Sequence, residues 1–510
     1  MQNVLALMTL CAAAASSVAA PAAKVPVMTA EQKAVVERIS AASLRGHLSF
    51  IASDLLEGRG TPSRGQELAA EYIAAQYRRA GLEAIGDDEY FQTANWTYTE
   101  PNLTGLNFAI RNGAQQFSLP AKQLSFAPGP AIQVKGAQIV RADWNNLAPL
   151  EALGEQVAGK VVLVELPPAS YKTLEEYEAG QAERRAVLER INKLKPALVL
   201  ALDRARKSGN GGGRGDVADP AKPRAPSGPN VTMHGEQPIA LFDALPAGLT
   251  AATLDINLAA AEVKPIKLRN IAAVLRGSDP ALKDNFIVVS AHYDHVGMRP
   301  ELPGDKIFNG AIDNGSGTVS LIEIATAMSG MKQKPRRSIL FLNMFGEELG
   351  MLGSAYYGRN PLVPVAKTTA NLNLEHMARQ VGKESAPHEA GLTGFDFSTL
   401  PATMAKAAQL AGTRIFKDEK NSDAYFSRSD NVSLARLGVP AHTLSVVYEF
   451  PDYHKEGDHW QKVDFENMAQ VNRAVALGIL ALANDPAAPQ WNKTLPAVTP
   501  YLKAQETMLR

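Results

Sequence analysis

The sequence contains a single cysteine, Cys11, among its 510 residues. One cysteine excludes an intramolecular disulfide, a cysteine-based zinc knuckle and an iron–sulfur cluster. A metal ion in this protein must therefore be bound by histidine, aspartate and glutamate side chains. An excess of charge is also absent, because 52 Lys and Arg residues balance 52 Asp and Glu residues. A neutral chain without a basic block argues against nucleic acid or an anionic membrane surface as its main partner.

Long apolar runs are scarce as well, and the continuous apolar stretch lies within the first twenty residues. Residues 4–15 have the length of a signal-peptide core, whereas a membrane span takes about 20 apolar residues. Ser16-Ser17-Val18-Ala19 follows with the small side chains of a cleavage site, although no Lys or Arg precedes the core. We expect cleavage after Ala19, which removes Cys11. The segment predicts export to the periplasm or the medium, without stable membrane insertion.

The remaining composition is that of a globular protein. Hydrophobic residues make up 45% of the chain and charged residues 20%, which excludes a disordered or fibrous protein. The length alone predicts two to four domains.

The second half of the chain alternates between two kinds of pattern. Apolar runs at 286–291, 338–344, 369–374 and 441–447 have the length of buried strands, and helical patterns separate them at 317–328, 350–358, 402–410 and 465–482. This alternation predicts an α/β fold in which a mixed, largely parallel central sheet is flanked by helices.

The first half differs in texture. Residues 39–81 have a helical pattern, whereas 128–263 contain short β-type runs at 159–166, 197–202 and 239–242, one charged helix and a glycine-rich loop at 209–215. We therefore expect an inserted, mainly β domain. The predicted division is a signal peptide at 1–19, an N-terminal part of the main domain at 20–127, the insertion at 128–263, the catalytic part at 264–485 and a loosely ordered tail at 486–510.

Histidine and carboxylate side chains follow the predicted strands, one group after another. Each group alone has an ordinary structural explanation, such as a helix start or a surface hydrogen bond. Because the carboxyl ends of parallel strands meet at one edge of a sheet, successive groups at these ends predict a common site. The groups are His292 with Asp294 and His295, Asp313, Glu347 with Glu348, Glu375 with His376, and Tyr453 with His454.

Several carboxylates in one cleft repel each other and resist ionisation. A pair of divalent cations removes that cost, and a mixed set of imidazole and carboxylate ligands suits zinc. Two such ions can share a carboxylate and a water molecule, which makes the water more acidic and polarises a carbonyl group. One acid must then stay free of metal to transfer the proton.

Five segments in this order resemble the secreted co-catalytic di-zinc exopeptidases, which include bacterial zinc aminopeptidases and are similar to glutamate carboxypeptidase II. The resemblance covers roughly 270–482 and extends to 47–90. The stretch 128–263 resembles in texture the protease-associated domain that many members carry as an insertion. The matching segments are Ala291-His292-Tyr293-Asp294-His295, Asn309-Gly310-Ala311-Ile312-Asp313-Asn314, Phe345-Gly346-Glu347-Glu348-Leu349-Gly350, Asn373-Leu374-Glu375 and Tyr453-His454.

The resemblance implies a role for each matching residue, a peptide as substrate and two Zn²⁺ ions as cofactors. His292 and Glu375 would bind one zinc ion, Glu348 and His454 the other, and Asp313 would bridge both. Glu347 would be the general base. Asp294 would orient the ring of His292, and Tyr453 would donate a hydrogen bond to the oxyanion.

Some assignments stay open at this point. Many members have Asp where this chain has Glu375, and His376 beside it is a rival ligand. Neighbouring residues on a strand point to opposite faces, so we expect only one of the two, Glu375, to reach the metal. His295 and His459 are expected to form local hydrogen bonds. Arg428 could bind a substrate carboxylate or pair with Asp430, and we favour the pair.

The activity expected from these residues is that of an aminopeptidase acting on short peptides. A carboxypeptidase or dipeptidase on the same metal site is the alternative. A glutaminyl cyclase, which uses a single zinc ion on this fold, is disfavoured by the complete two-metal set. A non-catalytic binding protein is disfavoured because such a protein need not keep Glu347 beside all the ligands.

Overall fold

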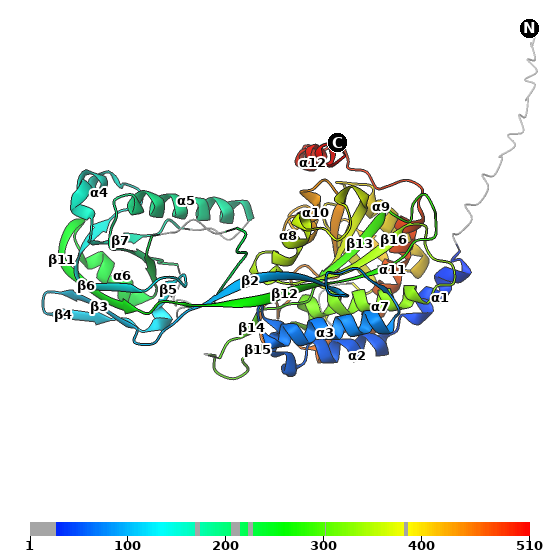
Figure 1. Cartoon of the computed structure of the whole chain (residues 1–510), viewed down its shortest axis with the longest axis horizontal. Helices are drawn as coiled ribbons and strands as arrows, with labels where there is room; N and C mark the ends of the chain where they lie inside the picture. Colours follow the sequence, from blue (N-terminus) through cyan, green and yellow to red (C-terminus); the bar gives the residue numbers. More distant parts are fainter. Residues whose placement is uncertain are drawn as a thin grey trace, which may run out of the picture.

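The computed structural model describes residues 27–168, 174–205, 215–222, 228–300, 302–381 and 386–509. The predicted signal peptide and most of the predicted glycine-rich loop lie outside these residues. The chain forms two lobes, and the long strands β2 (Phe91–Glu100) and β12 (Glu262–Leu275) run from one lobe to the other (Figure 1). Within the described ranges, no helix is both long enough and apolar enough to cross a membrane.

The larger lobe is built on a ten-stranded mixed sheet with the order β19-β18-β20-β17-β13-β16-β12-β2-β9, and β1 pairs with β12. Its centre is parallel, because β13 pairs in parallel with β16 and β17, and β17 with β20. The strands β12 and β2 continue the sheet in antiparallel pairing. The other strands are β1 (Glu83–Ala84), β9 (Asp216–Ala218), β13 (Phe286–His292), β16 (Ser338–Met344), β17 (Thr368–Leu374), β18 (Glu389–Leu392), β19 (Arg414–Phe416) and β20 (Ala441–Ser445).

Helices cover both faces of this sheet, and each face has its own hydrophobic cluster. Every residue of β13 and β16 is buried, as the continuous apolar runs predicted. One cluster joins the sheet to α1 (Ala30–Arg38), α2 (Ala41–Ile51), α3 (Arg64–Arg79), α7 (Gly317–Ser329), α9 (Leu400–Ala408) and α11 (Phe465–Asn484). The other joins it to α8 (Leu352–Arg359), α10 (Asn431–Ala435) and α12 (Thr499–Met508).

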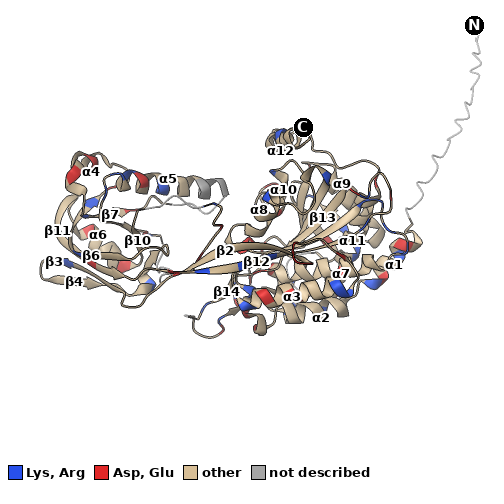
Figure 2. Ribbon diagram, viewed as in Figure 1, with Lys and Arg blue, Asp and Glu red and all other residues tan. Residues whose placement is uncertain are grey.

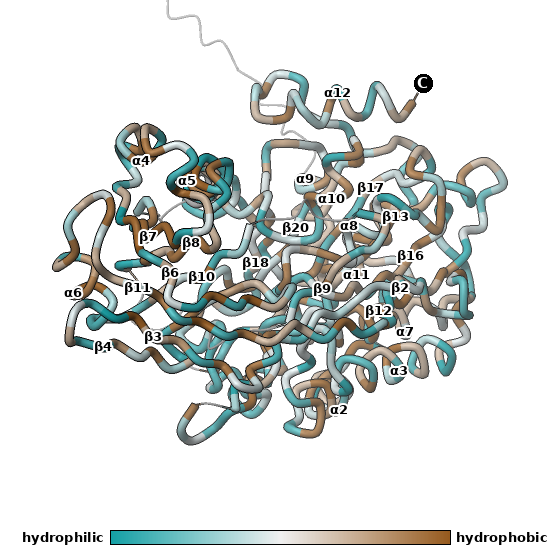
Figure 3. The backbone as a smooth tube through the Cα atoms, turned by 60° about the vertical axis from the view of Figure 1, so that its left-hand side comes forward, coloured by the Kyte–Doolittle hydropathy of each residue, from teal (hydrophilic) through white to brown (hydrophobic). Residues whose placement is uncertain are grey.

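The smaller lobe has a separate eight-stranded sheet with the order β4-β3-β11-β6-β7-β8-β10-β5. Two hydrophobic clusters of its own fill it, and the apolar strands β7 and β8 are central to them (Figure 3). Its strands are β3 (Asn107–Asn112), β4 (Gln115–Ser118), β5 (Leu124–Phe126), β6 (Ile132–Ala142), β7 (Val161–Glu165), β8 (Leu198–Leu202), β10 (Asn230–Met233) and β11 (Gly248–Leu258), and its helices are α4 (Ala148–Ala152), α5 (Leu174–Asn192) and α6 (Glu236–Ala244).

The lobe is inserted into a β-ribbon. The strands β2 and β12 pair antiparallel from Phe91 opposite Ile271 to Glu100 opposite Glu262, and the smaller lobe lies between their ends in the sequence. Three of its strands, β3 to β5, precede the predicted boundary at residue 128. Lys and Arg residues occur with Asp and Glu residues on the outer helices of both lobes, such as α3 and α5 (Figure 2).

Two expectations about local structure are wrong. Residues 239–242 were expected to form a strand but lie within α6, because a short apolar run fits a half-buried helix equally well. The tail was expected to be loosely ordered, yet it ends in α12 and buries Trp491 and Val498 against the main sheet. The proline-rich composition of this segment gave no sign that a few large apolar residues, such as Trp491, attach it to the core.

Candidate metal centre

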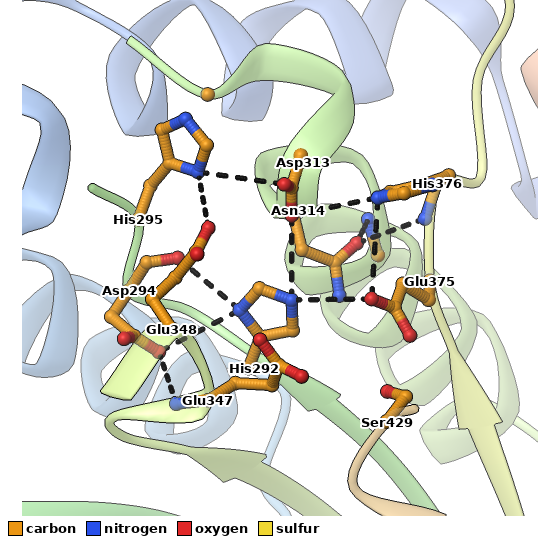
Figure 4. A network of polar contacts seen from close by, with 12 residues as sticks. His292, Asp294, His295, Asp313, Asn314, Glu347, Glu348, Glu375, His376 and Ser429 are labelled. Atoms are coloured by element: carbon orange, nitrogen blue, oxygen red, sulfur yellow. Dashed lines mark hydrogen bonds and ion pairs between the residues drawn. The ribbon is translucent and has the colours of Figure 1, made fainter. Parts of the chain in front are cut away.

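Most of the predicted site residues meet at the carboxyl ends of the parallel strands, and Figure 4 shows His292, Asp294, Asp313, Glu347, Glu348 and Glu375 among them. His292 ends β13, the turn η5 (Glu347–Leu349) follows β16, and Glu375 follows β17. Asp313 lies in the turn η4 (Ala311–Ser316), which leads into α7. His454 lies in the loop between β20 and α11. The alternation of strand and helix thus delivers ligands from five separate segments to one edge of the sheet.

One group of side chains surrounds the first carboxylate oxygen of Asp313. Its Oδ1 lies 3.5 Å from Nε2 of His292 and 3.6 Å from Nε2 of His376. Nε2 of His292 also lies 3.8 Å from Oε1 of Glu375.

A second group surrounds the other oxygen. Oδ2 of Asp313 lies 3.0 Å from Nε2 of His454, which is itself 3.2 Å from Oε2 of Glu348. Nδ1 of His295 lies 2.8 Å from Oε1 of Glu348 and 3.7 Å from Oδ2 of Asp313. Asp313 therefore stands between two groups of possible ligands, one on each of its oxygens.

These distances suit a pair of zinc ions. Two ligands that each lie about 2.1 Å from a tetrahedral ion are roughly 3.4 Å apart. The donor atoms of His292, Asp313 and Glu375 lie within 4.8 Å of one another, and so do those of His295, Asp313, Glu348 and His454. Among the described residues, the buried Nε2 atoms of His292, His376 and His454 have no hydrogen-bond partner. Imidazole nitrogens that face clustered carboxylates without a hydrogen bond fit metal ligation.

The pKa shifts of the buried side chains also indicate that the clustered carboxylates are stabilised by positive charge. Burial opposes the ionisation of Asp313, yet His376 and His454 hold its pKa well below its usual range. Burial likewise disfavours charge on His454, but contacts with Asp313 and Glu348 raise its pKa to about 10. Protonated histidines thus balance the carboxylates in a site of this composition, a role that bound cations would take over.

Glu347 and Asp294 lie beside these ligands. Desolvation raises the pKa of Glu347 well above its usual range, His292 opposes the shift, and Glu375 adds to it. The carboxylate of Asp294 accepts the backbone N–H of Glu347 at 3.1 Å and the hydroxyl of Thr61 at 3.1 Å, and it lies 3.6 Å from Nδ1 of His292. Asp294 therefore connects the ring of His292 to the turn that carries Glu347.

Glu375 belongs to the group of possible ligands with His292 and Asp313, and the side chain of His376 also lies near Asp313 without belonging to that group. The strand ends at Leu374, and His376 has a left-handed backbone with φ of 49°, so the alternation of a strand no longer applies. Asn314 holds this turn: its Oδ1 accepts the N–H of His376 at 3.2 Å, and its Nδ2 donates to the carbonyl of Leu374 at 3.0 Å. Sequence reasoning missed this function of Asn314, and its place directly after Asp313 was the available signal.

A cavity opens on the Glu375 side of the centre. Glu347, Glu375 and Tyr453 line its inner end, and Arg428 and Glu449 line it further out. Burial and the nearby carboxylates raise the pKa of Tyr453, whose ring stacks on His454 at 4.0 Å, so its hydroxyl stays protonated. The guanidinium of Arg428 lies over the ring of Tyr425, and no ion pair joins it to Asp430 in the described part of the chain.

A second hollow lies on the opposite side, against His295 and Glu348. Tyr98 of β2 lines it together with Gly215, which comes from the smaller lobe's sequence. The N–H of Gly215 donates to the Tyr98 hydroxyl at 3.2 Å. The inserted segment therefore reaches the edge of the centre.

Residues 270–479 match the model described as Peptidase family M28. This part of the chain is thus similar to the peptidases of that family. An aminopeptidase from Aneurinibacillus sp. strain AM-1 is 18% identical, with 90% of this chain and 97% of that chain covered and a TM-score of 0.61. A zinc aminopeptidase from Bacillus subtilis is 17% identical, with 88% and 97% covered and a TM-score of 0.54. These structures confirm the predicted mixed α/β fold of the metallopeptidase.

Curated relatives extend the likeness to the carboxypeptidase branch. A probable glutamate carboxypeptidase of Arabidopsis thaliana is 24% identical over 482 residues, which cover 82% of this chain and 64% of the relative. Across three of the curated relatives, the aligned part spans 32% to 64% of the relative's length. The resemblance drawn from the sequence motifs is thus confirmed for the metallopeptidase domain.

Proposed function

We propose that this protein is an exported di-zinc exopeptidase that removes N-terminal residues from short peptides. The observation that carries this proposal is the pair of ligand groups that share Asp313, with Glu347 beside them at the inner end of a cavity. His292 and Glu375 would hold one zinc ion, Glu348 and His454 the other, with Asp313 between them. Zinc ions bound there would polarise a peptide carbonyl and make a water molecule more acidic.

The chain's own residues supply the remaining chemistry. Glu347 accepts the proton of the attacking water on its carboxylate and passes it to the leaving amine. Asp294 fixes both the His292 ring and the Glu347 turn through the contacts described above. Tyr453 donates its hydroxyl proton in a hydrogen bond to the negative oxygen that develops on the substrate carbonyl.

The preference for a free N-terminus rests on charge. Carboxylates of Asp313, Glu347 and Glu375 line the inner end of the cavity, where a substrate ammonium group would be stabilised. The two solved structures named above are aminopeptidases by their titles.

A carboxypeptidase or dipeptidase is the second candidate, and Arg428 favours it. This arginine lines the cavity, is exposed and has no ion pair with Asp430, so its guanidinium can bind a substrate carboxylate. The Arabidopsis relative carries the name of a probable glutamate carboxypeptidase.

Blocked peptides separate the two candidates. We expect cleavage of a free tripeptide and of its C-terminal amide, and no cleavage of its N-acetyl form. Cleavage of the N-acetyl form with loss on amidation would assign the carboxypeptidase instead.

Metal analysis of the same active preparation should find two zinc ions per chain, and one ion or none would refute the di-zinc site. Ring closure of an N-terminal glutamine without hydrolysis would indicate a cyclase, and metal binding without any turnover would indicate a binding protein.

Export and the nature of the smaller lobe complete the proposal. The support for export is the apolar run 4–15 followed by Ser16-Ser17-Val18-Ala19. N-terminal sequencing of the protein recovered outside the cytoplasm should begin at Ala20, and an intact N-terminus there would contradict cleavage. We assign the smaller lobe to the protease-associated type because it is an insertion that reaches the centre through Gly215.

A further inference from the structure

The backbone that carries Asp313 is held by two buried side chains of opposite charge. Residues 309–313 run through the centre without a continuous helix or strand, and Gly310 has a left-handed backbone with φ of 58°. Arg59 binds the first half of this segment and Asp458 binds the second. Both charged residues are at most 1% exposed.

Arg59 satisfies backbone carbonyls from separate parts of the chain. Its guanidinium donates to the carbonyls of Asn309 at 2.7 Å and Gly310 at 2.8 Å. It also donates to the carbonyl of Ile51 at 2.6 Å and to that of Tyr293 at 2.8 Å. Tyr293 is the residue directly after His292. One planar cation therefore fixes the segment before Asp313 relative to the end of β13.

The chain accepts unfavourable backbone angles to place this arginine. Glu57, Gly58 and Arg59 in the turn η1 (Asp54–Arg59) all have left-handed angles, with φ of 50°, 68° and 50°. Angles of this kind cost energy in residues other than glycine and persist where the surrounding structure fixes them. A Cβ atom on Gly58 would lie 2.4 Å from the carbonyl oxygen of Phe308, so the turn is pressed against the segment that it holds.

Asp458 binds the donors of the same segment. Its carboxylate accepts the N–H groups of Ile312 at 2.9 Å and Asp313 at 3.1 Å. Its backbone carbonyl accepts the N–H of Ala311 at 3.1 Å. The carbonyls of the segment thus face a cation, its N–H groups face an anion, and Asp313 projects from between them.

The charge of Arg59 also bears on the centre. Burial lowers the pKa of Arg59 to about 10, and Asp294, Asp458, Asp313 and Glu348 oppose that shift, so the guanidinium stays charged at neutral pH. A permanent cation near these acids lowers their mutual repulsion. The geometry matters as much, because ligand distances must hold within about 0.2 Å for tight metal binding.

We propose that Arg59 and Asp458 are positioning residues. They fix the backbone of residues 309–313 so that Asp313 presents one carboxylate oxygen to each of the two groups of possible ligands. This inference rests on the proposed di-zinc function. Neither residue lines the cavity beside Glu375, so both act on metal affinity and turnover through Asp313.

Arg337 provides a matched control. It is also a buried arginine, 3% exposed, and within the described part of the chain its guanidinium donates only to backbone carbonyls, those of Leu482, Asp485 and Pro486. It lies at the opposite end of the sheet, just before β16. A substitution there disturbs the same kind of contact without touching the segment of Asp313.

The test compares Arg59→Lys, Asp458→Asn and Arg337→Lys in the full chain by zinc titration of the metal-free protein, urea unfolding and steady-state kinetics. Removing groups that orient metal ligands costs about 10- to 100-fold in metal affinity, and we expect such a loss at the weaker zinc site for Arg59→Lys and Asp458→Asn. At saturating zinc, their kcat should fall while KM stays within about twofold, because only the transition state depends on Asp313 geometry. Arg337→Lys should lower stability alone.

Each outcome decides the question. A loss of stability with unchanged zinc affinity and kcat in both site variants, as expected for Arg337→Lys, would overturn the proposal. If Arg59→Lys does not fold, Asp458→Asn decides, because it keeps the size of the side chain while turning an acceptor into a donor that faces two N–H groups. A wild-type chain that binds fewer than two zinc ions would refute the di-zinc function, a result distinct from failure of this inference.

Discussion

Glu347 and Glu348 are adjacent in the sequence, yet their side chains have different surroundings. Glu348 lies within hydrogen-bonding distance of His295 and His454, which lower its pKa to about 2 against the effect of burial. Glu347 lines the cavity, and its desolvation raises its pKa. One carboxylate is placed to hold a cation, whereas the other is placed to take up a proton.

The two substitutions should therefore have separable signatures. Glu347→Gln keeps the size and both zinc ions but cannot accept a proton, so we expect kcat to fall by about 10²–10⁴ with little change in KM. Glu348→Gln should weaken one zinc site, and excess zinc should partly restore its activity. Zinc content and kinetics of both variants check this. Loss of a zinc ion from Glu347→Gln together with full zinc in Glu348→Gln would reverse the two roles.

His442 on β20 makes stability depend on pH. Burial lowers its pKa to about 4, and its ring nitrogens are occupied by the Ser398 hydroxyl at 2.6 Å and the Thr393 carbonyl at 2.8 Å. In the unfolded chain the imidazole titrates near pH 6.5, so between pH 6.5 and 4 the unfolded state binds a proton that the folded state does not. The stability that the neutral ring provides is fully present above pH 6.5 and decreases as the pH falls.

We expect His442 to remove about 2 kcal/mol from the free energy of unfolding between pH 7.5 and pH 5. His442→Gln cannot take up a proton and should lose that much less over the same interval, although it starts from a lower stability. Urea unfolding of both proteins at pH 7.5 and pH 5 measures the difference. Equal losses in the two proteins would show that His442 does not titrate in this way.

At the scale of elements, much of the site's arrangement could be predicted from the sequence. The apolar runs before His292, Glu347 and Glu375 mark parallel strands, and parallel strands share an edge, so the neighbourhood of these residues follows from the pattern. The left-handed turns at Arg59 and His376 could not be predicted in this way. Their conformation depends on partners such as Asn314 and Asn309, which are distant in the sequence.

The C-terminal segment shows the same limit for packing. Trp491 is buried, its ring stacks on Tyr501 at 5.2 Å, and its indole N–H donates to the carbonyl of Gly438 at 2.9 Å. A proline- and alanine-rich stretch gives no periodic signal, although a single large aromatic side chain can attach it to the core.

We expect Trp491→Ala to lower the free energy of unfolding by about 3–5 kcal/mol, since it empties a buried aromatic site. Lys493→Ala, on an exposed position of the same segment, should change it by less than about 0.5 kcal/mol. Urea unfolding of the two variants checks this expectation. A Trp491→Ala protein as stable as the wild type would show that the segment adds nothing to the fold.

At the scale of the whole molecule, the two lobes have separate cores. The hydrophobic clusters of the larger lobe share no residue with those of the smaller lobe. The ribbon of β2 and β12, whose last pair is Glu100 opposite Glu262, connects the lobes, and the inserted sequence also returns to the larger sheet as β9. Each lobe thus has the internal contacts that an independent folding unit needs.

This organisation allows the smaller lobe to be removed, together with the edge strand β9 and its buried Val217, which belong to the larger lobe. Replacing residues 101–261 with Asn-Gly would close the ribbon as a two-residue hairpin, because Glu100 and Glu262 already face each other. The shortened chain should fold, bind two zinc ions and hydrolyse a dipeptide, since every residue of the ligand groups lies outside the deletion. It loses Gly215, one wall of the hollow beside His295 and Glu348, so a longer substrate would lose contacts on that side. We therefore expect the ratio of kcat/KM for a hexapeptide to that for a dipeptide to change while the dipeptide value stays near that of the full chain. Gly215→Ala in the full chain is the matched point variant, because its Cβ would lie 2.2 Å from the Tyr98 ring and displace it. An unchanged ratio in both proteins would show that the inserted lobe takes no part in selecting peptides.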